Sequence, residues 1–358
     1  MSSVFGRRWF VSLILLTSVA SAEKPKQDKD IDPFPLSKPI HGYKYGQVIE
    51  LTERDDGLYI KADSEYQKAR DQVEEFRVTK FRDRLRNKTT KTRVPNPSTE
   101  GMFVKEGITY AVWDKRAMLL DLYGPEKNLS EKRPVIILVH GGGWGRGSHK
   151  GYRSLAINLA KRGFFTIAVE YRLSGEAPLP AAIYDIKACV RWIRSNAKRY
   201  NFNPNAIGIA GGSAGGHLSA LSAVTNGNNR FEGTANHLDF SSEINAVLSF
   251  YGPFAWIFKQ ALGKNIKGRI AFKDALPDHH IRKGAKFPPL LCINEDIQKH
   301  RKSHKDWGQS TVQWIKDNDA GKADFFIFEA PHGYLHFAPF QDKAIDHAEE
   351  FFKGVFKR

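Results

Sequence analysis

Short apolar runs alternate with longer segments of helical periodicity from about residue 103 onward. The runs are residues 118–123, 135–140, 164–171, 206–211, 246–252, 290–294 and 325–330. Continuous apolar strands separated by helices are typical of a parallel sheet that is covered on both faces. The pattern therefore predicts an open α/β domain over residues 103–358, in which ligands bind beyond the carboxyl ends of the strands.

The segment between the third and fourth runs shows the helical period most clearly. Its apolar residues recur at steps of three and four and form one stripe; they are Ile183, Ile186, Val190, Ile193 and Ala197. We expect a second helix after Ser213 and a last helix over about residues 343–357. Residues 253–288 are longer than a simple crossover and favour a small cap over the site.

The first 22 residues have the layout of a signal peptide. A basic start with Arg7 and Arg8 precedes a short apolar run and small residues that end at Ala22. The run is shorter than the ~20 residues that a spanning helix needs, so we expect cleavage rather than a stable membrane span. The protein is then exported, periplasmic or secreted. The paired arginines also resemble a twin-arginine signal, so the export route stays open.

Residues 23–102 are polar and interrupted by prolines, which predicts an N-terminal extension outside the α/β pattern. Within it, residues 64–85 suit a charged surface helix with a sparse apolar face. No chemistry is indicated there.

The formal net charge of +16 raises the question of polyanionic partners. Much of the basic excess is scattered before residue 100 and near the C-terminus, and no nucleic-acid motif accompanies it, so we expect no nucleic-acid partner. Contact of an anionic polysaccharide with the basic surface stays open. Cys189 and Cys292 lie in apolar patterns and are expected to be buried free thiols. No cluster at metal-ligand spacing is present, and we expect no metal and no cofactor.

The stretch from residue 206 to 224 reads as a strand, a sharp turn and a helix around Ser213. The turn is Gly211-Gly212-Ser213-Ala214-Gly215. A G-x-S-x-G motif in this context is typical of a nucleophile whose strained backbone needs small neighbours. The helix that follows favours developing negative charge at its first turn.

A second glycine-rich segment, residues 140–147, follows the apolar run 135–139. Its sequence begins His140-Gly141-Gly142-Gly143-Trp144, and such a loop can turn successive backbone N–H groups toward one point. A phosphate-binding loop would carry Lys-Ser or Lys-Thr after its glycines, and none follows here. The loop therefore favours an oxyanion hole.

His332 follows the last predicted strand and precedes Gly333. A nucleophilic serine needs a base within hydrogen-bond reach, and a histidine at this place can provide it. His336 is the competitor, four residues on. The order serine, acid, histidine along the chain favours His332.

With these motifs, residues from about 105 to 357 resemble the α/β-hydrolase superfamily, in its exported esterase/lipase branch with an HGGG loop. The stretch from Tyr171 through the serine turn is similar to acetyl-xylan and feruloyl esterases. The resemblance implies an α/β-hydrolase fold with Ser213 as nucleophile and His332 as general base. It also implies an oxyanion hole made by the N–H groups of Gly142, Gly143 and Ala214.

The acid departs from the pattern of that superfamily, P-P-x-L-x-x-H-G-x-x-D. Here a gapless alignment of residues 287–303 puts Gln298 at the acid's position. Asp296 reaches the place if the loop is shortened by two residues, and it is our first choice. Glu295 is the second, and a displaced or absent acid the third.

These features predict a serine-dependent carboxylic ester hydrolase that forms an acyl-enzyme. The expected substrate is a small ester or an acylated glycan such as an acetylated polysaccharide. One alternative is a serine peptidase of the prolyl-oligopeptidase type, although residues 23–102 are too few for the usual propeller. The other is a catalytically weak hydrolase fold that binds glycans.

Overall fold

The computed structural model describes residues 51–54, 57–60, 92–113, 116–125, 131–254, 272–281, 287–295 and 308–356. Its centre is a sheet with the strand order β1-β2-β4-β5-β7-β6-β8-β9-β10-β11. In chain order these strands are β1 (Leu51–Arg54), β2 (Gly57–Ile60), β4 (Phe103–Trp113), β5 (Arg116–Gly124), β6 (Arg133–Val139), β7 (Phe165–Val169), β8 (Phe202–Gly212), β9 (Ala246–Phe250), β10 (Leu290–Glu295) and β11 (Ala323–Phe328).

The half of the sheet that carries the glycine-rich segments is parallel, as predicted. Neighbouring strands from β7 through β6, β8, β9 and β10 to β11 all run in the same direction. Strands β1, β2, β4 and β5 are joined by antiparallel pairs, and β5 pairs antiparallel with β7. Each of the seven apolar runs forms one of the strands β5 to β11.

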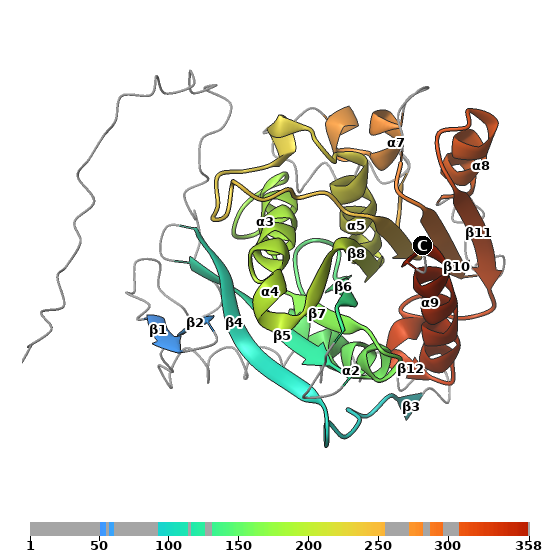
Figure 1. The fold of residues 1–358 in the computed structure, drawn as a ribbon. Coiled ribbons are helices and arrows are strands. Elements are labelled where there is room, and N and C mark those ends of the chain that lie inside the picture. Colours follow the sequence, from blue (N-terminus) through green and yellow to red (C-terminus); the bar gives the residue numbers. More distant parts are fainter. Residues whose placement is uncertain are drawn as a thin grey trace, which may run out of the picture. The chain divides into compact units, whose positions relative to one another are not determined.

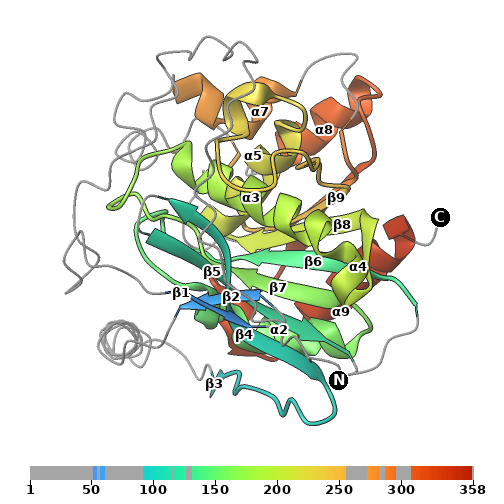
Figure 2. The ribbon, with the colours of Figure 1, turned by 60° about the vertical axis from the view of Figure 1, so that its left-hand side comes forward.

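Helices cover both faces of the sheet, with α3 and α5 on one side and α2 and α9 on the other (Figures 1 and 2). The α-helices are α2 (Arg153–Lys161), α3 (Ala181–Ser195), α4 (Ala197–Tyr200), α5 (Ala214–Val224), α7 (Pro277–His280), α8 (Gln309–Asp317) and α9 (Phe340–Phe356). The 3-10 turns are η1 (His149–Tyr152), η2 (Asn229–Phe231), η4 (Phe272–Ala275) and η5 (Tyr334–His336).

Strand β6 shows why the apolar runs have no polar alternation. Val135, Ile137 and Val139 pack into the apolar cluster that includes α3 and α5. Ile136 and Leu138, which point the other way, pack into the cluster that includes α2 and α9. Both faces of a strand in the middle of the sheet are thus buried, and every position must be apolar.

The predicted apolar stripe of α3 is confirmed, because Ile183, Ile186 and Ile193 are completely buried. The helix is also buried on its other sides, where charged residues are paired. Asp185 binds the Arg172 guanidinium at 2.8 Å. Lys187 donates to Glu232 at 2.7 Å. Buried charges are tolerated when they are paired in this way, so α3 can be buried on all sides against the parallel strands.

The polar region before residue 103 contributes strands that the periodicity did not predict. Strands β1 and β2 extend the large sheet beside β4. Strand β3 (Thr92–Arg93) pairs with β12 (Phe337–Ala338) in a second, two-stranded sheet. The charged helix expected at residues 64–85 lies outside the described residues, as do residues 1–22.

The cap expected at residues 253–288 is described only in part. Residues 255–271 and 282–286 lie outside the described residues, and η4 and α7 form the part between them. Thr311 of α8 donates to Asp278 of α7 at 2.5 Å, which joins these two helices.

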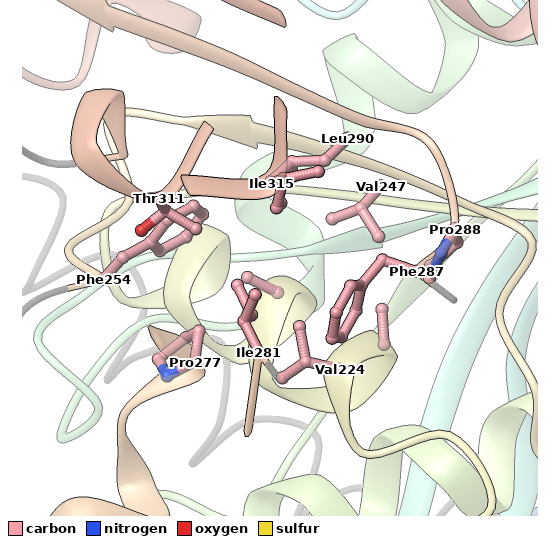
Figure 3. A pocket seen from close by; sticks show the side chains of 12 residues that line it. Val224, Val247, Phe254, Pro277, Ile281, Phe287, Pro288, Leu290, Thr311 and Ile315 are labelled. Carbon is pink, nitrogen blue, oxygen red and sulfur yellow. The ribbon is translucent and has the colours of Figure 1, made fainter. Parts of the chain in front are cut away.

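A small apolar cavity lies among α5, α7, α8 and the starts of β9 and β10 (Figure 3). Phe254, Ile281 and Phe287 are among the side chains that line it. Its volume of about 10 Å³ is the room of roughly one water molecule. Val247 and Leu290 line the cavity and lie near the amino ends of β9 and β10. The cavity is therefore away from the edge where ligands are expected.

Cys189 and Cys292 are buried free thiols, as expected. Burial raises the pKa of both thiols well above the usual value. Within the described ranges, none of the helices has the length and apolar character needed to cross a bilayer.

Candidate active site

Ser213 lies in the turn between β8 and α5, at the carboxyl edge of the parallel strands. Its backbone has φ 56° and ψ −121°, a left-handed conformation that residues with a side chain rarely adopt. Such strain persists only where the surroundings hold it, and it is common at functional sites. Ser213 N–H donates to the Phe250 carbonyl oxygen of β9 at 2.9 Å. The predicted strand, turn and helix are confirmed.

The glycines around Ser213 are required by close backbone packing. A Cβ at Gly215 would overlap the carbonyl oxygen of Val139, at the end of β6. A Cβ at Gly212 would lie 2.5 Å from the Tyr251 hydroxyl and 2.6 Å from the Tyr152 hydroxyl. The glycine positions of the turn therefore admit no side chain, and this packing holds Ser213 in place.

The loop of residues 140–147 runs directly beside this turn. A Cβ at Gly141 would lie 3.4 Å from Ser213 Cβ and 2.7 Å from the Gly212 carbonyl oxygen. Gly142 and Gly143 have φ of 124° and 60°, which favours glycine at both positions. Ala214 is the first residue of α5, so its N–H has no acceptor within the helix. The three predicted oxyanion donors thus belong to two segments that meet at Ser213.

His332 lies in the loop between β11 and η5. Its Nε2 is 3.2 Å from Ser213 Oγ, and its side chain is 48% exposed. The ring packs edge-on against Tyr251 with 4.9 Å between ring centres. The structure therefore places His332 where the sequence predicted a base for Ser213.

The acid beside His332 is Glu295, which corrects our first choice. Glu295 Oε1 lies 2.6 Å from His332 Nδ1, and the Glu295 side chain is 1% exposed. Asp296 and Gln298 lie outside the described residues. The reason is the length of β10: the apolar pattern ends the strand near Ile293, whereas the strand continues to Glu295. Asn294 and Glu295 pair with Ile327 and Phe328 of β11 and are buried.

His336, the competing histidine, is not at the serine. It ends η5, and its ring lies 5.6 Å from the Tyr152 ring. Burial lowers the pKa of His336 to about 4. Its carbonyl oxygen accepts a hydrogen bond from Val94 N–H, next to the two-stranded sheet.

Three buried tyrosines lie next to the site residues, and we did not predict them from the sequence. Burial raises the pKa of Tyr152, Tyr251 and Tyr334, so each keeps its hydroxyl proton. The Tyr152 and Tyr251 hydroxyls are hydrogen-bonded to each other, and the Tyr152 hydroxyl is also hydrogen-bonded to the backbone of Gly141 and Gly212. Tyr152 thereby joins the glycine loop to the serine turn. Tyr334 donates to the Ile293 carbonyl oxygen at 3.1 Å, beside Glu295.

Only Tyr251 had a signal in the sequence, since it lies near the end of the predicted apolar run 246–252, at the same edge as Ser213. It has a φ of 42° and is followed by Gly252. Tyr152 and Tyr334 lie in short 3-10 turns, and nothing in the local pattern distinguishes them from core residues.

The arrangement can perform nucleophilic acyl transfer. A neutral imidazole at His332 can take the Ser213 proton through Nε2, while Nδ1–H donates to the Glu295 carboxylate. The first turn of α5 lies directly behind the attacking oxygen, where backbone N–H groups stabilise negative charge. Among the described residues no group of His, Cys, Asp and Glu is arranged to hold a metal ion.

Comparison with known proteins shows that the chain is similar to esterases. The family model BD-FAE matches residues 120–288. The esterase LipC of Mycobacterium tuberculosis is 31% identical over 198 residues, which cover 51% of this chain and 48% of LipC. The probable carboxylic ester hydrolase LipM of the same organism is 35% identical over 199 residues, which cover 50% of this chain and 44% of LipM. The chain thus spans about half the length of these curated relatives.

Solved structures match over a larger part of the chain. Esterase 2 of Thermogutta terrifontis is 26% identical with a TM-score of 0.62, over 73% of this chain and 97% of that protein. A truncated carbohydrate esterase from gut microbiota is 27% identical with a TM-score of 0.61, over 74% of this chain and all of that protein. These matches confirm the predicted fold and the resemblance to esterases.

Proposed function

We propose that this chain, an α/β-hydrolase similar to esterases, hydrolyses carboxylic esters through an acyl-enzyme on Ser213. The observation that carries the proposal is the continuous line from Ser213 Oγ through His332 to Glu295, with separations of 3.2 Å and 2.6 Å. The esterase relatives support the choice of ester over other acyl compounds.

In the proposed reaction Ser213 Oγ attacks the ester carbonyl carbon, and its proton passes to His332 Nε2. The N–H groups of Gly142, Gly143 and Ala214 stabilise the oxyanion of the tetrahedral intermediate. The C–O bond to the alcohol then breaks, and His332 returns the proton to the leaving oxygen. Water attacks the acyl-enzyme by the same route and releases the acid.

We further propose a short-acyl ester as substrate, with acetylated polysaccharide as the leading class. The carbohydrate esterase among the similar structures supports an acylated glycan.

The test compares the wild-type protein with Ser213→Ala on p-nitrophenyl acetate and on acetylated xylan. We expect the variant to lose at least about a thousandfold in kcat, because it lacks the nucleophile. Ser219→Ala is the matched control. Ser219 lies on α5, the helix that follows Ser213, and donates to the Gly215 carbonyl oxygen at 2.8 Å without reaching His332. Equal turnover by wild type and Ser213→Ala would refute the proposal. Turnover of p-nitrophenyl acetate without release of acetate from xylan would refute the glycan substrate alone.

A further inference from the structure

The glycine-rich loop contains one bulky residue in a strained conformation. Trp144 follows Gly142 and Gly143, has a φ of 60°, and is only 6% exposed. A left-handed backbone costs a residue of this kind on the order of 1 kcal/mol or more, so other contacts must hold it. Its carbonyl oxygen accepts from Ser174 N–H at 2.8 Å. Its indole Nε1–H donates to His217 Nδ1 at 3.1 Å.

His217 is a buried imidazole that the proposed reaction does not use. It lies on α5 one turn after Ser213, and its own backbone N–H donates to the Ser213 carbonyl oxygen at 3.1 Å. Its Nε2 is 2.7 Å from the Ala275 carbonyl oxygen, in η4. Figure 1 shows α5 beside the segment that contains α7, where η4 also lies.

The partners of His217 allow one protonation state. An indole N–H can only donate, so Nδ1 must be the acceptor; a carbonyl oxygen can only accept, so Nε2 must carry the proton. The imidazole is therefore neutral, and burial lowers its pKa to about 4. His217 is thus a fixed connector among the glycine loop, α5 and η4.

The need for such a connector is greatest at Gly143. A Cβ at Gly143 would meet nothing within 4 Å, whereas a Cβ at Gly142 would overlap the Arg146 carbonyl oxygen. Glycine also has more backbone freedom than any other residue. The fixed point next to Gly143 is Trp144, and Trp144 is held by His217.

We propose that the Trp144–His217 hydrogen bond is a positioning device that orients the N–H groups of Gly142 and Gly143 toward the oxyanion at Ser213. This inference rests on the proposed ester hydrolysis and assigns Trp144 and His217 as positioning residues. A donor that is displaced by a fraction of an ångström stabilises the transition state less, while binding of the uncharged substrate is unchanged.

The test uses variants that remove the hydrogen bond but keep the packing. Trp144→Phe keeps a buried aromatic ring, and His217→Leu keeps a side chain of similar volume. Trp113→Phe is the matched control, since Trp113 is equally buried and its Nε1 has no hydrogen-bond partner in the described part of the chain. His217→Asn retains an acceptor near the place of Nδ1.

We expect Trp144→Phe and His217→Leu to lower kcat on p-nitrophenyl acetate about ten- to hundredfold with KM changed less than about twofold, since loss of a whole oxyanion donor costs about 10²–10³. The inhibition constant of an alkyl trifluoromethyl ketone, whose serine adduct carries an oxyanion, should rise by the same factor. His217→Asn should lose less than His217→Leu. A change in KM alone, or a loss in kcat no larger than that of Trp113→Phe, would overturn the inference.

A second measurement separates this inference from the proposed function. In the wild-type protein the indole proton of Trp144, assigned by its absence in Trp144→Phe, should exchange slowly with solvent, and His217→Leu should speed that exchange. Rapid exchange in the wild type would overturn the inference whatever the activity. An inactive wild type with a protected indole proton would refute the ester hydrolase and leave the anchored loop standing.

Discussion

The two halves of the proposed catalytic site, Ser213 in one and His332 with Glu295 in the other, are held in place by different means. Ser213 lies between β8 and α5 in a turn whose glycines press against backbone atoms of β6. His332 lies in a loop, 48% exposed, and its ring contacts Glu295 and the ring of Tyr251. The strand before His332, β11, is largely half-exposed or exposed along its length. Backbone packing thus fixes the nucleophile, whereas one buried carboxylate fixes the base.

This difference explains why the serine turn could be recognised in the sequence, whereas Glu295 was only our second choice of acid. Positions of the turn that admit no side chain must be glycine, so the turn around Ser213 can be recognised in the sequence. The identity of the acid depends on where β10 ends, and that is decided by pairing with β11. Asn294 and Glu295 look like loop residues because they are polar, yet both are buried in the strand.

The largest effect should follow from Glu295→Gln, which breaks the histidine half. The amide cannot stabilise imidazolium and can present its N–H to Nδ1, so we expect kcat to fall about ten-thousandfold, as for the equivalent change in a serine protease. Steady-state kinetics on p-nitrophenyl acetate measure it. Asp296→Asn is the matched control and should stay within about threefold of wild type. If Asp296→Asn carried the large loss instead, Glu295 would not be the acid.

A second substitution, Gly215→Ala, breaks the serine half. The new Cβ would overlap the Val139 carbonyl oxygen and lie 2.7 Å from that of His140, so neighbouring backbone must move. We expect the free energy of unfolding to fall by about 4 kcal/mol, measured by urea denaturation.

The control for this substitution is Gly175→Ala, because a Cβ at Gly175 would meet nothing within 4 Å. It should change the free energy of unfolding by less than about 0.5 kcal/mol. Equal effects of the two substitutions would show that the turn tolerates a side chain and that packing does not fix Ser213.

The smallest expected effect is a loss of folding stability at acidic pH that comes from His217. The pKa of His217 is about 4 in the folded protein, whereas an exposed histidine in the unfolded chain titrates near 6.5. Between these values the unfolded state binds the proton and the folded state does not. The contribution of His217 is therefore complete above pH 6.5 and is lost as the pH falls toward 4, by up to about 3 kcal/mol.

Urea denaturation at pH 7.5, 6, 5 and 4.5 measures this loss. His217→Asn should show a constant offset from wild type above pH 7 and a shallower decline below pH 6.5, because the variant lacks the titrating group. Parallel curves for the two proteins would contradict the assignment of a neutral, hydrogen-bonded His217.

The architecture could be predicted for those elements that are buried on all sides. The central strands are buried on both faces and are recognised as continuous apolar runs, and α3 is recognised by the helical period of its apolar stripe. Strand β4 was missed because Gly107 and two shifts in register against β5 interrupt any regular alternation. Strands β1, β2, β3 and β12 have only two to four residues, too few to show a periodic pattern, and only their partners in the sheets make them strands. The positions of Tyr152, Tyr251 and Tyr334 at the site could not be predicted for a similar reason, because these residues come from segments far apart in the chain.

The two buried cysteines have a practical consequence for studying this chain. Because Cys189 and Cys292 are its only cysteines and both thiols stay protonated, the folded protein presents no reactive sulfur to an alkylating reagent. A single cysteine introduced on an exposed position, such as Gly175, would then be the one site that takes a spectroscopic label. The native sequence thus provides a background in which motion of one chosen segment can be followed without removing any residue.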